Sequence, residues 1–219
     1  LKAEIKRDGK KYEIAFANSL KKKELKEIDK VGQRNTGTKI TFKPDERFFD
    51  TEKISAKALS YSLRAKAVLC PGLKIKFKNE INGEKEEWCF VDGLGDYLTT
   101  ELGEGIYIPG EPIIGEFNDD ETGLSWAVIW ERGDRESINE SYVNLIPTLQ
   151  GGTHVSGMRT GITDAIKEFC DYRKLIPKGL KLTPDDVWKN CSYVLSAKLK
   201  DPQFTGQTKE KLSSKDFQN

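Results

Sequence analysis

The chain has 219 residues, of which 37% are hydrophobic and 32% are charged, and these proportions exclude an intrinsically disordered protein. The net charge of +1 gives no general attraction to nucleic acid, and no apolar run approaches the roughly 20 residues that a membrane-spanning helix needs. Two small domains would fit this length, because domains typically contain about 100 to 150 residues.

The charges are distributed unevenly along the chain. Residues 1–30 contain ten Lys or Arg and six acidic residues, which gives +4, whereas residues 101–140 contain eleven acidic residues and two arginines, which gives −9. An acidic face of that size would repel DNA, so any DNA contact is expected elsewhere in the chain.

The cysteines and the histidine predict neither a metal site nor a disulfide framework. No C-x-x-C pair, the spacing typical of zinc sites, occurs among the four cysteines, which are Cys70, Cys89, Cys170 and Cys191. His154 is the only histidine, so no histidine cluster can form, and a structural role after the turn at Gly151–Gly152 is favoured over a catalytic one. We expect reduced thiols and no bound metal.

In the N-terminal part, alternating polar and apolar residues predict two strands. These strands cover Lys11–Phe16 and Lys39–Phe42, and Asp8–Gly9 forms a turn before the first of them. We expect the lysine-rich segment Lys21–Lys30 to connect the two strands.

The next segment predicts a helix followed by a hairpin. Apolar residues recur at helical spacing at positions 54, 58, 61, 65 and 68, and Pro71–Gly72 ends the pattern, so an amphipathic helix is expected before this pair. Strands are predicted over Leu73–Phe77 and Glu87–Val91, joined across Asn82–Gly83, because an Asn-Gly pair is a strong hairpin signal.

A second domain is expected to begin near Gly93 and to contain a mixed sheet. Strands are predicted over Ser125–Glu131 and Ser141–Ile146, and Pro109–Pro112 predicts a loop ahead of them. A helix is expected to begin just after Gly157, with an apolar stripe that comprises Ile162, Ala165, Ile166 and Phe169.

The last predicted elements are a short helix and a strand. Thr183 is suited to cap a helix, with Pro184 at its first position and two acidic residues in its first turn, and this helix is expected to run through Trp188. The strand that follows is predicted from the alternation of Tyr193, Leu195, Ala197 and Leu199.

Residues 92–96, DGLGD, contain two glycines that could be mistaken for a nucleotide-binding motif. The segment is too short for G-x-G-x-x-G. We expect these glycines to form the turn into a helix.

The loop after the last predicted strand carries groups suited to a phosphate. It has the sequence DPQFTGQTKEKLSS from Asp201 onward. Gly206 tolerates backbone angles that other residues resist, Lys209 offers a mobile cation, and Gln207 and Thr208 add neutral donors. The alternative is a polar surface turn, because lysine-bearing loops cover most soluble proteins.

Three stretches of the chain resemble the B subunits of bacterial type IIA topoisomerases in their order and spacing. The DPQFTGQTKEKLSS loop resembles the transducer-domain loop that enters the ATP site of the neighbouring domain. ESYVNLIPTLQGGTHVSGMR, residues 140–159, resembles the strand, turn and helix start of the same transducer. RNTGTKITFKPD and LRAKAVLCPG, residues 34–45 and 63–72, resemble the end of the family's ATPase domain. The phrases NLIPTLQGGTH and DPQFTGQTKEKLSS favour topoisomerase IV, with gyrase as the alternative.

The resemblance implies an α+β fold in two parts. Residues 1–92 would be the end of a GHKL-type ATPase sandwich, and residues 93–219 a ribosomal-protein-like βαβ transducer domain that is incomplete at its C-terminus. The N-terminus lacks an initiating methionine and a signal-peptide core, so we expect the chain to be part of a longer protein. No segment resembles the family's catalytic glutamate and magnesium-binding asparagine, so this fragment alone is expected to be inactive and to bind no nucleotide.

The resemblance also implies roles for four residues. Lys209 would be catalytic, contacting the terminal phosphate of ATP with help from Gln207, and Thr38 is similar to the threonine that lines the adenine pocket. Arg159 is similar to the arginine that faces the cavity where a DNA duplex passes, where a guanidinium can contact phosphates without reading sequence. The alternatives are a strand hydroxyl for Thr38 and a solvated helix charge for Arg159.

The implied intact protein hydrolyses ATP with magnesium in order to pass one DNA duplex through another, which decatenates and relaxes DNA. Its implied partners are DNA, the A subunit of topoisomerase IV and a second B subunit in an ATP-dependent homodimer, in the cytoplasm and with no membrane. The rival interpretation is a non-enzymatic DNA- or protein-binding α+β module, in which Lys209 is a solvated surface charge.

Overall fold

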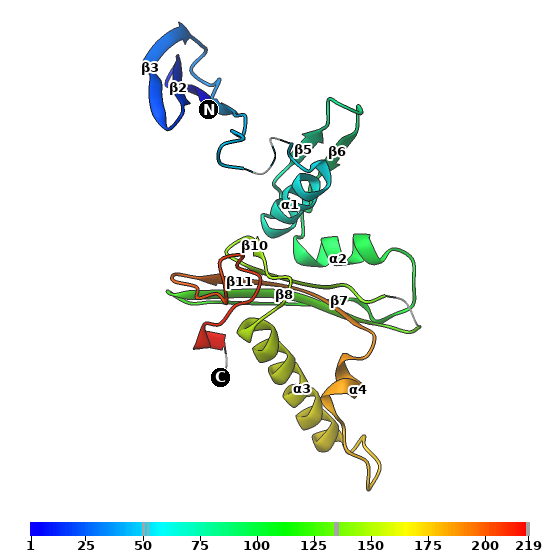
Figure 1. The fold of residues 1–219 in the computed structure, drawn as a ribbon. Helices are drawn as coiled ribbons and strands as arrows, with labels where there is room; N and C mark the ends of the chain where they lie inside the picture. Colours follow the sequence, from blue (N-terminus) through cyan, green and yellow to red (C-terminus); the bar gives the residue numbers. More distant parts are fainter. Residues whose placement is uncertain (50, 52, 134–135, 218–219) are drawn as a thin grey trace. The chain divides into compact units, whose positions relative to one another are not determined.

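The computed structural model describes residues 1–49, 51, 53–133 and 136–217. The chain forms two compact units, residues 1–55 and 56–219, which are drawn in Figure 1. No helix in the described ranges is both long and apolar enough to cross a membrane. The domain boundary expected between Asp92 and Gly93 falls inside the second unit, and the division into ATPase and transducer parts stays a prediction.

The first unit is a four-stranded antiparallel sheet with the order β3-β2-β1-β4. Its strands are β1 (Lys2–Arg7), β2 (Lys10–Ala17), β3 (Leu20–Lys30) and β4 (Gly37–Thr41). The two predicted strands are confirmed as β2 and β4, and the predicted turn at Asp8–Gly9 lies between β1 and β2.

The segment Lys21–Lys30 was expected to be a connection, and this expectation is wrong, because it belongs to strand β3. Every residue of β3 is exposed, so the strand has no buried face to produce an apolar alternation. Ion pairs join it to β2 instead, with 2.7 Å between Lys10 Nζ and a Glu27 oxygen and 2.9 Å between Lys23 Nζ and a Glu13 oxygen. Opposite charges facing each other across strands are a recognised source of pairing energy.

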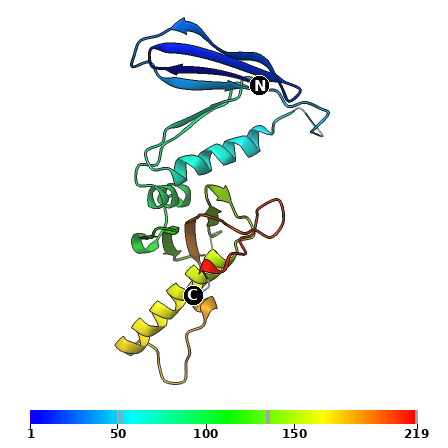
Figure 2. The same ribbon diagram turned by 90° about the vertical axis from the view of Figure 1, so that its left-hand side faces the viewer.

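The second unit has three layers, with a five-stranded sheet in the middle. Helices α1 (Ala56–Leu69) and α2 (Leu94–Leu102) cover one face, and α3 (Thr153–Arg173) and α4 (Pro184–Trp188) cover the other (Figure 2). The sheet has the order β10-β9-β11-β8-β7. Its strands are β7 (Tyr107–Asn118), β8 (Thr122–Glu131), β9 (Asn139–Val143), β10 (Ile146–Pro147) and β11 (Cys191–Leu199).

Strand β11 is the centre of this sheet and confirms that the sheet is mixed. It pairs antiparallel with β8 and parallel with β9, so β9, α3 and β11 form the βαβ unit that the family resemblance implies. All of its residues except Lys198 are buried, because helices cover both faces. The α+β fold class is therefore confirmed.

Several local predictions are confirmed in the second unit. The amphipathic helix is α1, and the Asn82–Gly83 hairpin joins β5 (Ile75–Lys78) to β6 (Lys85–Trp88). Gly93 is the N-cap of α2, as expected for the DGLGD segment. Thr183 and Asp186 form a capping box at the start of α4.

The prediction of a loop at Pro109–Pro112 is wrong, because these residues lie within strand β7. The pairing of β7 with β8 shifts register between Ile108 and Ile113, so the four residues bulge out of the ladder and do not leave the strand. Proline removes a ladder hydrogen bond, which is tolerated at such a bulge and on the edge strand of a sheet.

The start of α3 also differs from the prediction, since the helix begins at Thr153 and not after Gly157. Gly152 is its N-cap with φ 138°, and the Thr153 N–H donates to the Leu212 carbonyl at 3.2 Å. Position 157 lies inside the helix and needs glycine, because a Cβ there would lie 2.1 Å from the Phe217 carbonyl oxygen. Its role is thus close packing within the helix.

His154 lies in the first turn of α3, where it is 1% exposed. Its Nε2 lies 3.1 Å from Thr148 Oγ1, which in turn lies 2.7 Å from Ser141 Oγ. Burial lowers the pKa of His154 from 6.5 to about 4. The neutral, buried ring agrees with the structural role favoured above.

Gly152→Ala should destabilise the protein by about 2 kcal/mol or more, because a Cβ would lie 2.3 Å from the Leu212 carbonyl oxygen at an unfavourable φ. Thermal or chemical unfolding measures this change. The control is Gly161→Ala on the same helix, which has open space around it and should be neutral or stabilising by up to about 1 kcal/mol. Equal stability of the two variants would contradict the close contact.

His154 should make the free energy of unfolding sensitive to acid. The unfolded imidazole takes up a proton near pH 6.5 and the folded one only near pH 4, so stability should fall as the pH drops between these values, by at most about 3 kcal/mol. The measurement is chemical denaturation at several pH values of wild type and His154→Gln. An unchanged difference between the two proteins from pH 7 to pH 4 would contradict the buried neutral ring.

Candidate functional site

The segment with the Lys209 side chain forms a loop, defined here as residues 203–213 and called the Lys209 loop. Its two ends are joined by backbone hydrogen bonds from Thr205 N–H to the Lys211 carbonyl at 2.9 Å and from Ser213 N–H to the Gln203 carbonyl at 2.8 Å. Leu212 is 1% exposed and packs in the cluster that includes Val143 and Ala197. The stem of the loop is therefore fixed to the body of the second unit.

The tip of the Lys209 loop, Gly206–Lys209, presents unpartnered donors. All four residues are exposed, and within the described part of the chain none of them makes a hydrogen bond or an ion pair. The Lys209 ammonium lies over the Phe204 ring, with 5.8 Å between Nζ and the ring centroid. One cation and the neutral donors of Gln207 and Thr208 thus share a small surface that fits a phosphate group.

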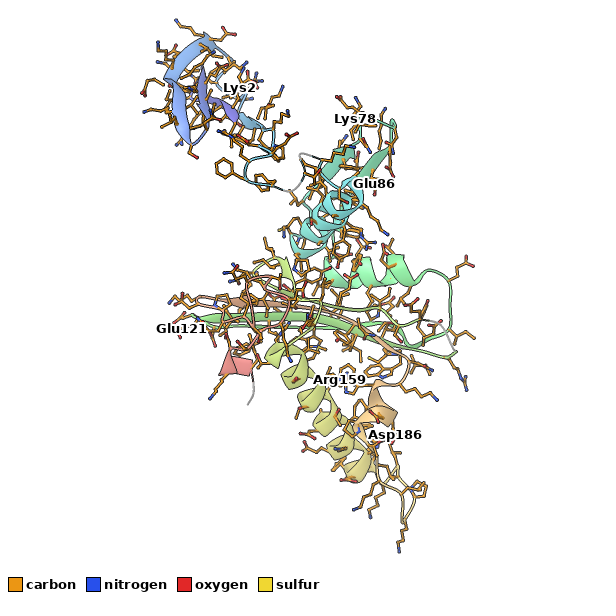
Figure 3. The ribbon with its side chains drawn as sticks, in the orientation of Figure 1. Lys2, Lys78, Glu86, Glu121, Arg159 and Asp186 are labelled. Atoms are coloured by element: carbon orange, nitrogen blue, oxygen red, sulfur yellow. The ribbon has the colours of Figure 1, made fainter. Side chains whose placement is uncertain are left out.

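Arg159 lies on α3, on the side that faces α4 (Figure 3). Its guanidinium carbon is 5.0 Å from the centroid of the Trp188 ring, a distance at which a cation–π contact orients the charge. Its carbonyl oxygen accepts hydrogen bonds from Thr163 Oγ1 at 2.6 Å and from Trp188 Nε1 at 3.3 Å. The residue is exposed and, among the described side chains, forms no ion pair, so its donors can bind an anion.

Thr38 lies on β4 of the first unit, opposite Ile5 of β1. It is exposed and lines a cavity of about 360 Å³. The other lining residues are Glu4, Lys6, Lys11, Thr36, Gly37 and Lys39. The structure thus brings Gln207 and Lys209 together on one loop and leaves Thr38 in a separate unit.

The described residues offer no metal centre. No group of three or more His, Cys, Asp or Glu side chains among them could hold a metal ion. The donor set does not suit the magnesium ion that accompanies ATP, and we assign no magnesium ligand to this chain. The four cysteines are free thiols.

Sequence reasoning missed some of the partners of these residues. Trp188 was predicted only as the end of a short helix, although its ring orients Arg159 and its Nε1 also donates to Thr163 Oγ1 at 3.0 Å. Gln150 belongs to a motif that was noticed, but its contact with Glu210 joins residues 60 positions apart. No local pattern indicates either contact.

The chain is similar to known B subunits of bacterial type IIA topoisomerases. A family model described as DNA gyrase B matches residues 76–219. The B subunit of DNA topoisomerase 4 from Escherichia coli is 51% identical over 96% of this chain and 34% of that protein. The corresponding protein of Francisella tularensis is 49% identical over 100% of this chain and 35% of that protein. The chain spans about a third of the length of these curated relatives.

Two solved structures share the fold over the whole chain. The topoisomerase IV ATP-binding domain of Francisella tularensis, solved with a small-molecule inhibitor, superposes with a TM-score of 0.78 at 48% identity, covering 100% of this chain and 59% of that one. The 43K ATPase domain of Thermus thermophilus gyrase B, solved with an aminocoumarin, gives 0.83 at 26% identity, covering 99% and 58%. The higher identity to topoisomerase IV confirms the preferred resemblance, and the match over residues 76–219 shows that the chain belongs to the DNA gyrase B family.

Proposed function

We propose that this chain is part of the ATP-hydrolysing B subunit of a type IIA DNA topoisomerase of the topoisomerase IV type. The observation that carries the proposal is the tip of the Lys209 loop, where a cation and neutral donors stand without partners among the described residues. The names of the relatives support the same assignment. In the intact protein, the activity is ATP-driven passage of one DNA duplex through another.

Lys209 binds the terminal phosphate of ATP in this proposal. A charge-assisted contact from its ammonium contributes roughly 1.5 to 3 kcal/mol, and Gln207 adds a weaker neutral hydrogen bond. The ammonium also stabilises negative charge on the phosphoryl oxygens as the terminal phosphate is transferred to water. Thr38 lines the adenine pocket in the same proposal.

Loss of the terminal phosphate removes its contact with Lys209, and this loss drives a conformational change. In this proposal the Lys209 loop belongs to the transducer domain and the nucleotide to the ATPase domain, so bound ATP would hold the two domains in one relative orientation. Hydrolysis and phosphate release would free them. The B subunits would then dimerise when ATP binds and separate after hydrolysis, so that their dimer acts as a gate.

Arg159 contacts the phosphates of the DNA duplex that is transported. A guanidinium that is oriented by Trp188 and has no acidic partner among the described residues can bind any sequence, since it contacts only the backbone. The A subunit, which carries the strand-cleaving chemistry in this family, is the second protein partner. The assembly works in the cytoplasm, where the nucleoid lies.

Lys209→Ala should reduce the DNA-stimulated ATP turnover of the full-length protein, assayed together with the A subunit, about ten- to a hundredfold, because it removes the charge-assisted contact. The melting temperature should not change, since Lys209 is exposed and makes no hydrogen bond among the described residues. The matched control is Lys211→Ala, which removes the same charge from the same loop. Normal turnover by Lys209→Ala would leave the non-enzymatic binding module as the better interpretation.

Arg159→Ala should lower DNA-stimulated ATP turnover several-fold more than basal turnover, because the guanidinium contacts only DNA. Steady-state ATPase assays with and without linear duplex measure both rates. Arg173→Ala is a matched control, since Arg173 lies at the other end of α3 and packs on an aromatic ring, Phe169, in the same way. Equal loss of basal and stimulated turnover in Arg159→Ala would contradict a DNA contact.

A further inference from the structure

The turn before α3 makes several hydrogen bonds to the C-terminal half of the Lys209 loop. Gln150 N–H donates to the Glu210 carbonyl at 2.9 Å, and Leu212 N–H donates to the Gly151 carbonyl at 3.0 Å. The Gln150 side-chain amide also donates to the Glu210 carboxylate at 2.8 Å. Glu210, the residue directly after Lys209, is therefore held at both its main chain and its side chain.

The turn that holds Glu210 is itself held by backbone hydrogen bonds, including one to β9. Gly151 N–H donates to the Thr148 carbonyl at 2.8 Å, and Thr148 N–H donates to the Ser141 carbonyl of β9 at 2.8 Å. The Thr148 hydroxyl lies under the turn between Ser141 and the buried ring of His154. These buried hydrogen bonds restrain the conformation of the turn.

The contact between the Gln150 amide and the Glu210 carboxylate also affects the charge near Lys209. The Gln150 amide occupies an oxygen of the Glu210 carboxylate, which is the acidic group nearest to Lys209 in the sequence. A carboxylate that is free to move could pair with the Lys209 ammonium and compete with an incoming phosphate. The amide therefore favours a loop in which Lys209 keeps its charge available.

We propose that Gln150 is a positioning residue for Lys209, acting through Glu210 and without contact with the nucleotide. This inference rests on the proposed function of Lys209. Gln150 fixes the stem of the Lys209 loop and restrains the neighbouring carboxylate. The contact between Gln150 and Glu210 therefore increases the affinity of Lys209 for the terminal phosphate of ATP.

The test exchanges the two partners in the full-length protein. Gln150→Glu places two carboxylates face to face and should weaken binding of a non-hydrolysable ATP analogue about tenfold. Binding of ADP should stay within about twofold of wild type, because ADP lacks the phosphate that Lys209 contacts. The double variant Gln150→Glu with Glu210→Gln restores one hydrogen bond with donor and acceptor reversed, and should recover analogue affinity to within about twofold.

Gln203→Glu is the matched control, because it adds the same charge to the other end of the same loop, away from Glu210. It should leave analogue affinity within about twofold of wild type. Three results would overturn the proposal: wild-type analogue affinity in Gln150→Glu, an equal loss of ADP affinity, or failure of the double variant to recover. A loss in Gln203→Glu as large as in Gln150→Glu would overturn it too, because charge alone would then explain the effect.

Lys209→Ala, measured with the same analogue, separates this inference from the proposed function. Weak analogue binding by Lys209→Ala with normal binding by Gln150→Glu would refute only the positioning role. Normal binding by Lys209→Ala would refute the phosphate contact itself. Gln150 is exposed, and melting temperatures of all variants identify any that fail to fold.

Discussion

The contact between Gly152 and Leu212 is the constraint on which the arrangement of the second unit depends. The two residues pair as an isolated parallel bridge, so the N-terminus of α3 and the C-terminal stem of the Lys209 loop share one point of attachment. No residue larger than glycine fits there, because the Leu212 backbone occupies the place of a Cβ. This close contact fixes where α3 begins and where the stem of the Lys209 loop lies. It thereby also fixes the position of Arg159 on the helix.

Much of the acidity between residues 101 and 140 serves the fold. Glu101 pairs with Arg64 at 2.7 Å, and the Glu140 carboxylate accepts hydrogen bonds from the hydroxyls of Tyr97 and Tyr142. Asp119 closes the turn between β7 and β8 by accepting from two backbone N–H groups, which lower its pKa. The segment is therefore not one uncompensated acidic face, and its charge gives a weaker argument about DNA than the count of −9 indicates.

Sequence patterns predicted the buried elements of the fold and missed those fixed by long-range contacts. Strand β11 and helices α1 and α4 were predictable, since periodicity and capping are local. Strand β3 was not, because it pairs with β2 along the backbone while all of its side chains are exposed, so no apolar alternation marks it. The start of α3 was misplaced because Gly157 looks like a helix boundary, and only the Phe217 carbonyl explains its presence inside the helix.

In the candidate site, too, the sequence indicated some residues and missed the long-range contacts that orient them. Family resemblance selected Lys209, Gln207, Arg159 and Thr38, and local chemistry alone would have favoured solvated side chains at most of these positions. The partners that orient them, Trp188 for Arg159 and Gln150 for the Lys209 loop, lie 29 and 60 residues away in the chain. Such pairs become visible only when the chain is folded.

The backbone at Lys209 gives a physical reason to regard its side chain as functional. Its φ of 58° lies in the left-handed region, where a residue other than glycine is disfavoured by about 1 kcal/mol. The Phe204 ring at 5.8 Å offsets part of that cost, but a glycine would avoid the cost altogether, as Gly206 does three residues earlier at φ 84°. The disfavoured backbone of an exposed lysine that has no ion pair among the described residues supports the proposed phosphate contact, because strained conformations are found more often at functional positions.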